Sequence, residues 1–168
     1  FLASPTRQPV ILTLRSGAKR DGTLTFRAVE TLHDNGAYTS WGATTPFVMM
    51  QTISSLYRVP HVKYHTTAVY TNNPYAGSFR GYGNLQSTFA VEQHMDKLAD
   101  ALGMDPLEFR LKNAQDPGEV TPQGMHFNTC GLKDCLSTAA KYGDYQAKRR
   151  ANTANWKSTG RTKRGVGI

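Results

Sequence analysis

A glycine-rich stretch near the middle of the chain combines residue types that can hold an anionic ligand. It reads Ala76-Gly77-Ser78-Phe79-Arg80-Gly81-Tyr82-Gly83-Asn84-Leu85-Gln86. Its three glycines permit backbone conformations closed to other residues and let a ligand approach the main chain. Backbone N–H groups next to a helix N-terminus suit a negative charge, while Arg80 adds a fork of donors and Tyr82 an aromatic face. A ligand-binding loop and a plain tight turn both fit this pattern.

Two known motifs share part of the stretch. Gly81-x-Gly83-x-x-Gln86 resembles a dinucleotide-binding fingerprint, but it lacks the third glycine and the acidic residue that follows in a parallel βαβ unit. Arg80-Gly81-Tyr82-Gly83 resembles the start of an RNA-recognition strand, yet the aromatic continuation that stacks bases is replaced by Asn84-Leu85-Gln86. Neither motif is complete.

The cysteines and histidines do not form a recognisable metal site. Cys130 and Cys135 are five residues apart, which is not the spacing of zinc or redox motifs. His61 and His65 would share a strand face, but no third ligand has a fitting spacing. We therefore predict no metal-binding site of the protein's own side chains.

The elements that must position the glycine loop begin with strands. Residues 10–14 are apolar and β-branched, residues 23–33 alternate, and Asp21-Gly22 lies between them, which predicts a β-hairpin. Asn35-Gly36 ends the second strand, so its neighbours His33-Asp34 are more simply a turn-flanking polar pair than an acid–base site. In that strand Leu24, Phe26, Ala28 and, after a shift, Leu32 share one face, and the other face carries Thr25, Arg27 and Val29.

The rest of the chain predicts a short helix, a third strand and then four helices. Residues 49–53 indicate the short helix and residues 62–70 the strand. The apolar spacing in 86–102 predicts a long amphipathic helix, ended by Gly103. Further helices are expected from an Asp105 N-cap with Pro106 and Glu108, and over 132–141 and 145–156. Strands first and helices after indicate an α+β fold, a mixed sheet or hairpin followed by helices.

The composition of the chain excludes a membrane-spanning helix and a disulfide-stabilised scaffold. The chain has 168 residues and a net charge of +8, no long apolar stretch that could cross a membrane, and only two cysteines. One segment, residues 141–164, holds eight bases and a single acid, so the rest is nearly neutral. Such a basic segment can bind nucleic acid, or can be a solvated surface or face an acidic partner. No known DNA-binding pattern surrounds it.

The chain begins Phe1-Leu2-Ala3 and ends on Gly165-Val166-Gly167-Ile168, which resembles a strand just starting. We therefore expect an internal fragment of a longer protein. No secretory signal is visible, and we expect a cytoplasmic location, with a periplasmic one left open.

Several blocks, in a fixed order, carry a resemblance to a known family. They are Asp34–Gly42, Leu56–Pro60, Val69–Pro74, Ala76–Gln86, positions in 89–99, Gly103–Asn113 and Gly131–Leu136. In this order they resemble the molybdenum-cofactor-binding large subunit of the xanthine dehydrogenase and aldehyde oxidase family. The likeness is nearest to the bacterial multi-subunit members, among them 4-hydroxybenzoyl-CoA reductase, nicotinate dehydrogenase and carbon monoxide dehydrogenase-like proteins.

The resemblance implies oxygen-atom transfer at a molybdenum centre, with electrons passing through 2Fe-2S clusters to FAD. It implies molybdopterin as cofactor, in bacteria often the cytosine dinucleotide form, with FAD and 2Fe-2S on partner subunits or domains. It also implies that Phe79, Arg80, Gly81 and Gly83 border the cofactor, and that Tyr82 packs on a substrate ring with an edge or offset contact worth about 0.5–1.5 kcal/mol.

Departures from the family pattern narrow the range of expected substrates and roles. Members that act on purines carry an arginine at the position of Val48, which therefore predicts an apolar substrate wall and favours an aldehyde, an aromatic heterocycle or an aryl-CoA thioester. The family's second glycine-rich loop and its catalytic glutamate lie outside this sequence. None of the four glutamates matches that base: Glu30, Glu92, Glu108 and Glu119.

We therefore expect one fragment of a cofactor-binding domain, with a strand-rich part (1–75), the glycine loop and helices (76–143) and a basic tail (144–168). It supplies one wall of the molybdenum site and holds no catalytic residue. Its expected partners are a small-molecule substrate, the remainder of the large subunit, and the FAD and 2Fe-2S subunits, but no membrane. The alternative is a non-enzymatic module that binds nucleic acid through residues 141–164.

Overall fold

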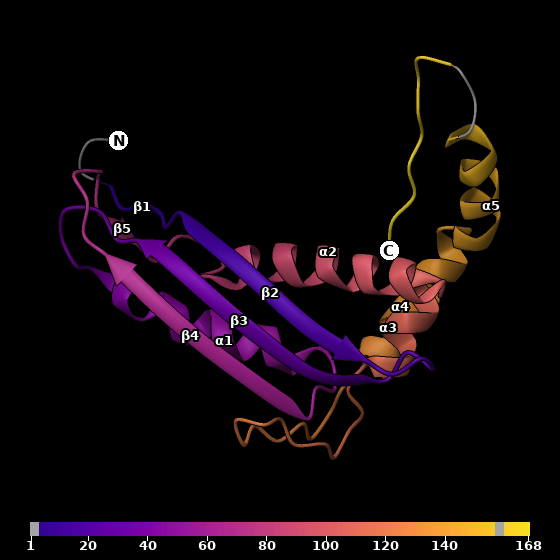
Figure 1. The fold of residues 1–168 in the computed structure, drawn as a ribbon, viewed down its shortest axis with the longest axis horizontal. Helices are drawn as coiled ribbons and strands as arrows, with labels where there is room; N and C mark the ends of the chain where they lie inside the picture. Colours follow the sequence, from indigo (N-terminus) through magenta and orange to yellow (C-terminus); the bar gives the residue numbers. More distant parts are fainter. Residues whose placement is uncertain (1–3, 157–159) are drawn as a thin grey trace.

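A three-stranded sheet covered on one face by two helices forms the body of the molecule (Figure 1). The computed structural model describes residues 4–156 and 160–168. Strands β2 (Val10–Ala18) and β3 (Leu24–Asp34) form the hairpin predicted around Asp21-Gly22, and β4 (His61–Val69) lies parallel to β3, giving the order β2-β3-β4. This confirms the α+β class and the third strand.

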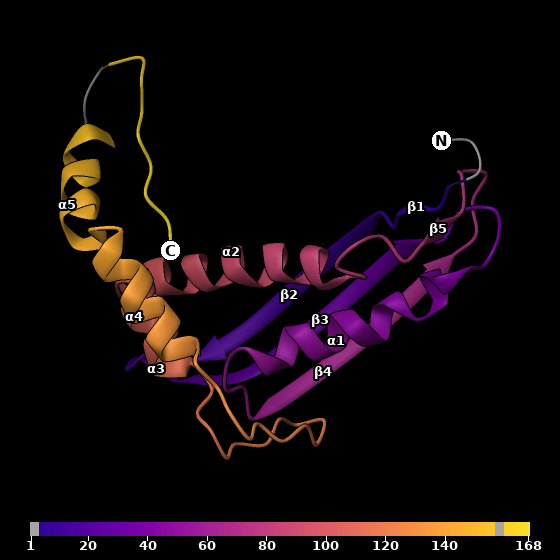
Figure 2. The same cartoon turned by 180° about the vertical axis from the view of Figure 1, so that it is seen from behind.

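Helices α1 and α2 lie on one face of this sheet, as the view from behind shows (Figure 2). Helix α1 (Thr45–Ser55) connects β3 to β4 and is preceded by a 3-10 turn, η1 (Trp41–Ala43). Helix α2 (Asn84–Leu102) ends at Gly103 in the left-handed conformation, as expected. The predicted short helix at 49–53 is thus a full helix, because Pro46 in its first turn suits the fixed φ of a helix start.

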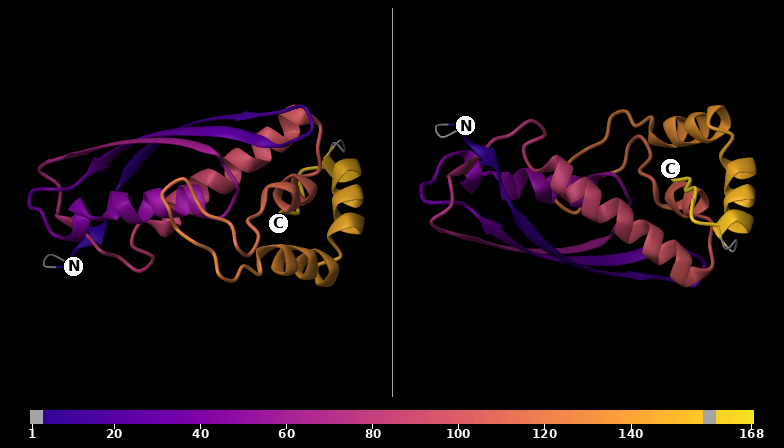
Figure 3. Two further views of the ribbon diagram at one scale, coloured as in Figure 1. Left: turned by 90° about the horizontal axis from the view of Figure 1, so that it is seen from below. Right: turned by 90° about the horizontal axis from the view of Figure 1, so that it is seen from above.

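Three smaller helices extend from the end of α2. Helix α3 (Pro106–Asn113) begins at the predicted N-cap, where Asp105 Oδ1 accepts the Leu107 N–H at 2.9 Å. Helices α4 (Leu132–Tyr142) and α5 (Tyr145–Trp156) follow and form an arm at that end of the molecule (Figure 3). No helix in the described ranges is long and apolar enough to cross a membrane.

The hydrophobic core lies between the sheet and the two covering helices. Val91, Met95 and Ala99 of α2 are fully buried in it, and burying a side chain the size of valine or methionine contributes about 1.5–3 kcal/mol. The core is completed by residues from the strands, α1 and α3: Leu24, Val29, Ile53, Tyr57, Val59 and Phe109.

The buried face of β3 is the more polar of its two faces. Arg27, Val29, Thr31 and His33 point inward, whereas Phe26 keeps 43 % of its surface exposed. The Arg27 guanidinium donates to the Ile53 carbonyl at 2.6 Å, and burial lowers the pKa of Arg27 to about 10. From the alternation of apolar residues alone, the opposite face of β3 would be expected to lie in the core.

A two-residue parallel pair joins the start of the chain to the glycine loop. Strand β1 (Thr6–Arg7) pairs with β5 (Ala76–Gly77), with Arg7 opposite Gly77. The pair lies at the end of the sheet where α2 begins (Figure 1).

Candidate functional site

The glycine loop connects β5 to α2 through three consecutive residues with positive φ. Gly81 and Gly83 each have φ of 95°, and Tyr82 between them has φ of 46°. The Tyr82 N–H donates to the Phe79 carbonyl at 2.7 Å, and the Asn84 N–H donates to the Gly81 carbonyl at 2.8 Å. Residues 79–82 have the hydrogen bond and glycine position of a type II turn, and residues 81–84 those of a type I′ turn.

Several backbone donors of this loop have no hydrogen-bond partner among the described residues. In the part of the chain that the structure describes, the N–H groups of Arg80, Gly81 and Gly83 donate to no other group. A Cβ built on Gly81 would come no closer than 3.8 Å to another residue, so the space beside its backbone is open. Arg80 and Gly81 are exposed, and Gly83 is the buried N-cap of the 19-residue helix α2. Free amides at the start of a helix suit an anionic oxygen.

Gly83 fixes the loop against helix α1. A Cβ at this position would lie 2.6 Å from Met49 Cγ and 2.9 Å from Thr45 Cγ2, which is closer than packed atoms can be. Glycine is therefore required at position 83 for two reasons, the positive φ of the backbone and the close approach of α1.

Arg7 holds the loop from the other side, and sequence reasoning missed it. One guanidinium nitrogen donates to the Arg80 carbonyl at 3.0 Å and another to Gln86 Oε1 at 3.4 Å. The same guanidinium lies 4.5 Å from the centre of the Phe79 ring. No local sequence signal marks Arg7, because only the pairing of β1 with β5 brings it here.

Tyr82 is held on the N-terminal end of helix α1. Its hydroxyl makes a hydrogen bond with the Thr44 hydroxyl, and its ring meets Trp41 edge-on at 6.4 Å between centroids. Val48 is half-buried one helical turn after Thr44 and on the same side of α1. The structure thus brings the two expected substrate-lining residues, Tyr82 and Val48, to one helix end.

A buried chain of hydrogen bonds lies behind the loop. Gln86 Nε2 donates to the Gln8 carbonyl at 3.2 Å, and the Gln8 side-chain oxygen lies 3.1 Å from His33 Nδ1. The other His33 nitrogen lies 2.9 Å from the Thr31 hydroxyl. His33 is fully buried, and this burial lowers its pKa to about 4. His33 therefore acts as a neutral structural group, and its neighbour Asp34 accepts the Gly36 N–H, as a turn-flanking residue does.

No group of three or more His, Cys, Asp or Glu that could hold a metal ion occurs within 4–156 and 160–168. Cys130 and Cys135 are free thiols. Glu92 accepts from Tyr57 and Arg110, and Glu119 from Arg58. These two carboxylates serve structural contacts away from the glycine loop.

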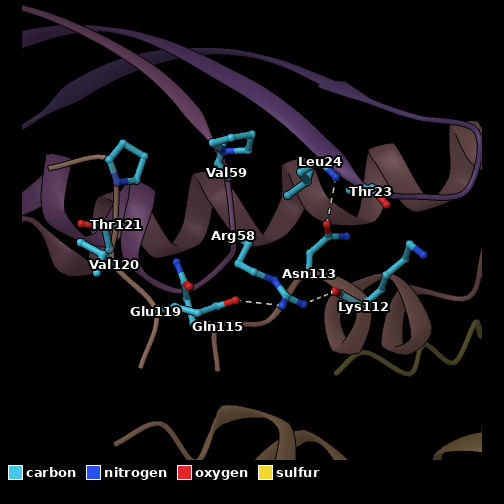
Figure 4. A pocket seen from close by; sticks show the side chains of 12 residues that line it. Thr23, Leu24, Arg58, Val59, Lys112, Asn113, Gln115, Glu119, Val120 and Thr121 are labelled. Carbon is cyan, nitrogen blue, oxygen red and sulfur yellow. Dashed lines mark hydrogen bonds and ion pairs between the residues drawn. The ribbon is translucent and has the colours of Figure 1, made fainter. Parts of the chain in front are cut away.

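A separate cavity of about 560 Å³ lies at the opposite end of α2 (Figure 4). Arg58 crosses it, donating to Glu119 at 2.9 Å and to the Lys112 carbonyl at 2.7 Å. Asn113 Oδ1 accepts the Leu24 N–H at 2.9 Å. These polar groups are partners of one another, and the buried lining atom without a partner among the described residues is an acceptor, Gln115 Oε1, unlike the unpartnered donors of the glycine loop.

The fold and the loop place the chain in a known class of cofactor-binding domains. Residues 1–114 match the family model of the molybdopterin cofactor-binding domain, and the chain belongs to this family. It is 38 % identical, over its whole length, to the xanthine dehydrogenase molybdenum-binding subunit of Escherichia coli O157:H7, of which it covers 22 %. It is also 38 % identical to the aldehyde oxidoreductase of Megalodesulfovibrio gigas, over 96 % of this chain and 17 % of that protein.

A solved structure has the same fold. The aldehyde oxidoreductase from Desulfovibrio gigas superposes with a TM-score of 0.82 and 36 % identity, over 94 % of this chain and 17 % of that one. The chain therefore spans about a fifth of the length of these relatives. Their resemblance confirms the expected family and gives no support to the nucleic-acid alternative. In the basic segment, Arg149 pairs with Asp105 at 2.9 Å, and Lys157 lies outside the described residues.

Proposed function

We propose that the chain is part of the catalytic subunit of a molybdenum-dependent oxidoreductase, and that residues 79–83 line its cofactor. The observation that carries the proposal is the set of N–H groups at Arg80, Gly81 and Gly83 that have no partner among the described residues, in a chain that belongs to the molybdopterin cofactor-binding family. The donors suit this group because the cofactor carries anionic phosphate and metal-oxygen groups. When bound, it supplies oxygen-atom transfer and two-electron redox chemistry.

The residues of this chain would bind and orient the cofactor, and they would not transfer protons. Arg80 and Gly81 would contact the cofactor through backbone donors that cost no rearrangement, because the two turns already hold them, and Phe79 and Gly83 would border it. No glutamate is assigned to general-base chemistry here. We expect the chain by itself to bind no stoichiometric molybdenum, since it provides only one wall.

The substrate wall would be apolar and aromatic. Tyr82 presents a ring held by Thr44 and Trp41, and Val48 provides an apolar side chain one turn along α1. This supports an aldehyde, an aromatic heterocycle or an aryl-CoA thioester over a purine, which would require a base near Val48. Membership of the 4-hydroxybenzoyl-CoA reductase branch is part of this proposal.

The remaining assignments follow from the family. The cofactor would be the cytosine dinucleotide form of molybdopterin, and FAD and 2Fe-2S clusters would reside on partner subunits or domains. The three parts of the chain, 1–75, 76–143 and 144–168, would belong to one cofactor-binding domain of a cytoplasmic enzyme.

A pair of glycine substitutions tests the proposal in the complete subunit. Gly81→Asp places a carboxylate beside the free amides and should abolish molybdenum retention, measured as metal per subunit after gel filtration. Gly118→Asp is the matched control, because Gly118 also has a positive φ, 88°, and open space around it. Equal molybdenum content in both variants and the wild type would contradict a cofactor contact at residues 79–83.

A further inference from the structure

Among the described residues, the guanidinium of Arg7 is the one charged side-chain group that hydrogen-bonds to the backbone of the 79–82 turn. It donates to the Arg80 carbonyl at 3.0 Å while its plane covers the Phe79 ring at 4.5 Å. A second nitrogen points to Gln86 Oε1 at 3.4 Å, on the first turn of α2. One side chain thus contacts the central carbonyl of the turn, the ring of its first residue, Phe79, and the helix that follows it.

The position of the Arg80 carbonyl decides where the Gly81 N–H points. The two groups belong to one planar trans peptide, so they point in opposite directions. Because the carbonyl faces Arg7 and the body of the protein, the Gly81 N–H faces away from Arg7. This N–H donates to no group in the described chain.

The same peptide is the one that differs between the two common turn types. Type I and type II turns differ by a flip of the central peptide, and type II requires a positive φ at the third residue, which Gly81 has at 95°. Glycine permits both orientations at low cost. The sequence of the turn alone therefore does not fix the direction of its donor, and an external contact is needed.

We propose that Arg7 is a positioning residue that locks the Arg80–Gly81 peptide and so directs the Gly81 N–H toward an anionic oxygen of the bound cofactor. This inference rests on the proposed function for the identity of the ligand, whereas the lock itself is a property of the chain. Arginine suits the role because its planar fork can donate in two directions and stack on an aromatic ring at once. Lysine has the charge but neither the fork nor the stacking plane.

The experiment compares four forms of the complete subunit: wild type, Arg7→Ala, Arg7→Lys and Arg15→Ala. Arg15 is the matched control, an exposed arginine of β2 outside the loop. The first measurement is amide hydrogen exchange, by mass spectrometry, of peptides covering residues 79–86 in cofactor-free protein. We expect exchange there to be about tenfold faster in both Arg7 variants and unchanged in Arg15→Ala. Without the contacts of Arg7 to the Arg80 carbonyl and Gln86 the turn opens as well as flips, and the Tyr82 and Asn84 amides are protected only while it is closed.

The second measurement is made on cofactor-loaded protein. We expect both Arg7 variants to lower kcat about tenfold with little change in KM, and to alter the electron paramagnetic resonance signal of the reduced molybdenum centre. If Arg7 acted only as a structural support or as a distant positive charge, Arg7→Lys would keep wild-type exchange and activity. Full activity and wild-type exchange in Arg7→Lys would therefore overturn the proposal, as would unchanged exchange in Arg7→Ala.

The two measurements separate this inference from the proposed function. If the wild-type subunit retains no molybdenum, the proposed function fails, while faster exchange in the Arg7 variants would still establish the lock. If the wild type is loaded and active and Arg7→Ala matches it in exchange, kcat and spectrum, the positioning role fails and the proposed function stands.

Discussion

Arg110 Nε lies 2.8 Å from Glu92 Oε2, joining helix α3 to the middle of helix α2. The arginine side chain is almost wholly buried, with 1 % exposed, whereas Glu92 keeps 29 % of its side chain accessible. Tyr57 donates its hydroxyl to the same carboxylate at 2.9 Å. Burial, with the nearby Glu92 charge, raises the pKa of Tyr57 well above its usual range, so it remains a neutral donor. Helix α2, helix α3 and the loop that follows α1 therefore meet at one carboxylate.

Removing Arg110 should strongly destabilise the protein. Arg110→Ala leaves a cavity and deprives the half-buried Glu92 of its cation, and breaking a buried pair on one side costs about 3–5 kcal/mol. We expect a loss of about 3 kcal/mol in the free energy of unfolding, measured by urea denaturation. The control is Asp96→Asn, since Asp96 also contacts Arg110 at 2.6 Å but is 53 % exposed. That change should cost about 1 kcal/mol or less in the free energy of unfolding. Similar losses in both variants would contradict the larger contribution of the buried Arg110–Glu92 pair.

Sequence patterns within a few residues predicted the elements around the site well, but they did not predict the contacts between residues far apart in the chain. The hairpin at Asp21-Gly22 and the Asp105 cap were predictable because turn and cap chemistry acts within a few residues. The glycine loop was recognisable for the same reason. Arg7 was not, since its role comes from contacts 73 and 79 residues away.

The buried face of β3 shows a second limit of sequence reasoning. Arg27 is buried because it can donate to the Ile53 carbonyl, and His33 because Gln8 and Thr31 occupy its two nitrogens. Hydrogen-bond partners from other elements thus outweigh apolar alternation. Their positions depend on the tertiary fold, which hydrophobic periodicity does not encode.

Two glycines with positive φ should respond differently to alanine. Gly83→Ala places a methyl group 2.6 Å from Met49 Cγ at φ of 95°, whereas Gly103→Ala meets nothing within 4 Å at φ of 66°. A left-handed non-glycine residue costs about 1–2 kcal/mol, and overpacking adds about 1–3 kcal/mol. We expect a loss of about 3 kcal/mol for Gly83→Ala and about 1 kcal/mol for Gly103→Ala in thermal unfolding. Equal losses would show that α1 yields freely at this contact.

His33 should make stability depend on pH in the acidic range. Burial lowers its pKa from 6.5 to about 4 in the folded protein, so between these values the unfolded chain binds a proton that the folded one does not. The contribution of His33 is therefore fully present above pH 6.5 and is lost as the pH falls toward 4. The total loss is on the order of 3 kcal/mol.

The test compares wild type with His33→Gln by denaturant unfolding at several pH values. Burial also lowers the pKa of His94, so both proteins lose some stability in this range. The glutamine variant does not titrate at position 33, and we expect its loss to be smaller by about 2–3 kcal/mol. Parallel pH profiles would mean that the pKa of His33 is the same in the folded and the unfolded chain, which would contradict the lowered value.

Tyr82 should determine how well an aromatic substrate is used, if the proposed function holds. Its ring is fixed by the Thr44 hydroxyl bond and the edge contact with Trp41, so it offers a pre-ordered surface. In the complete subunit, Tyr82→Ala should lower kcat/KM for an aromatic aldehyde about tenfold, because an aromatic pair contributes about 0.5–1.5 kcal/mol. Tyr82→Phe keeps the ring and should retain most of the activity. The loss should be smaller for a short aliphatic aldehyde, which has no ring to contact. Equal losses for both aldehydes would place Tyr82 away from the substrate and leave it as a support of the loop.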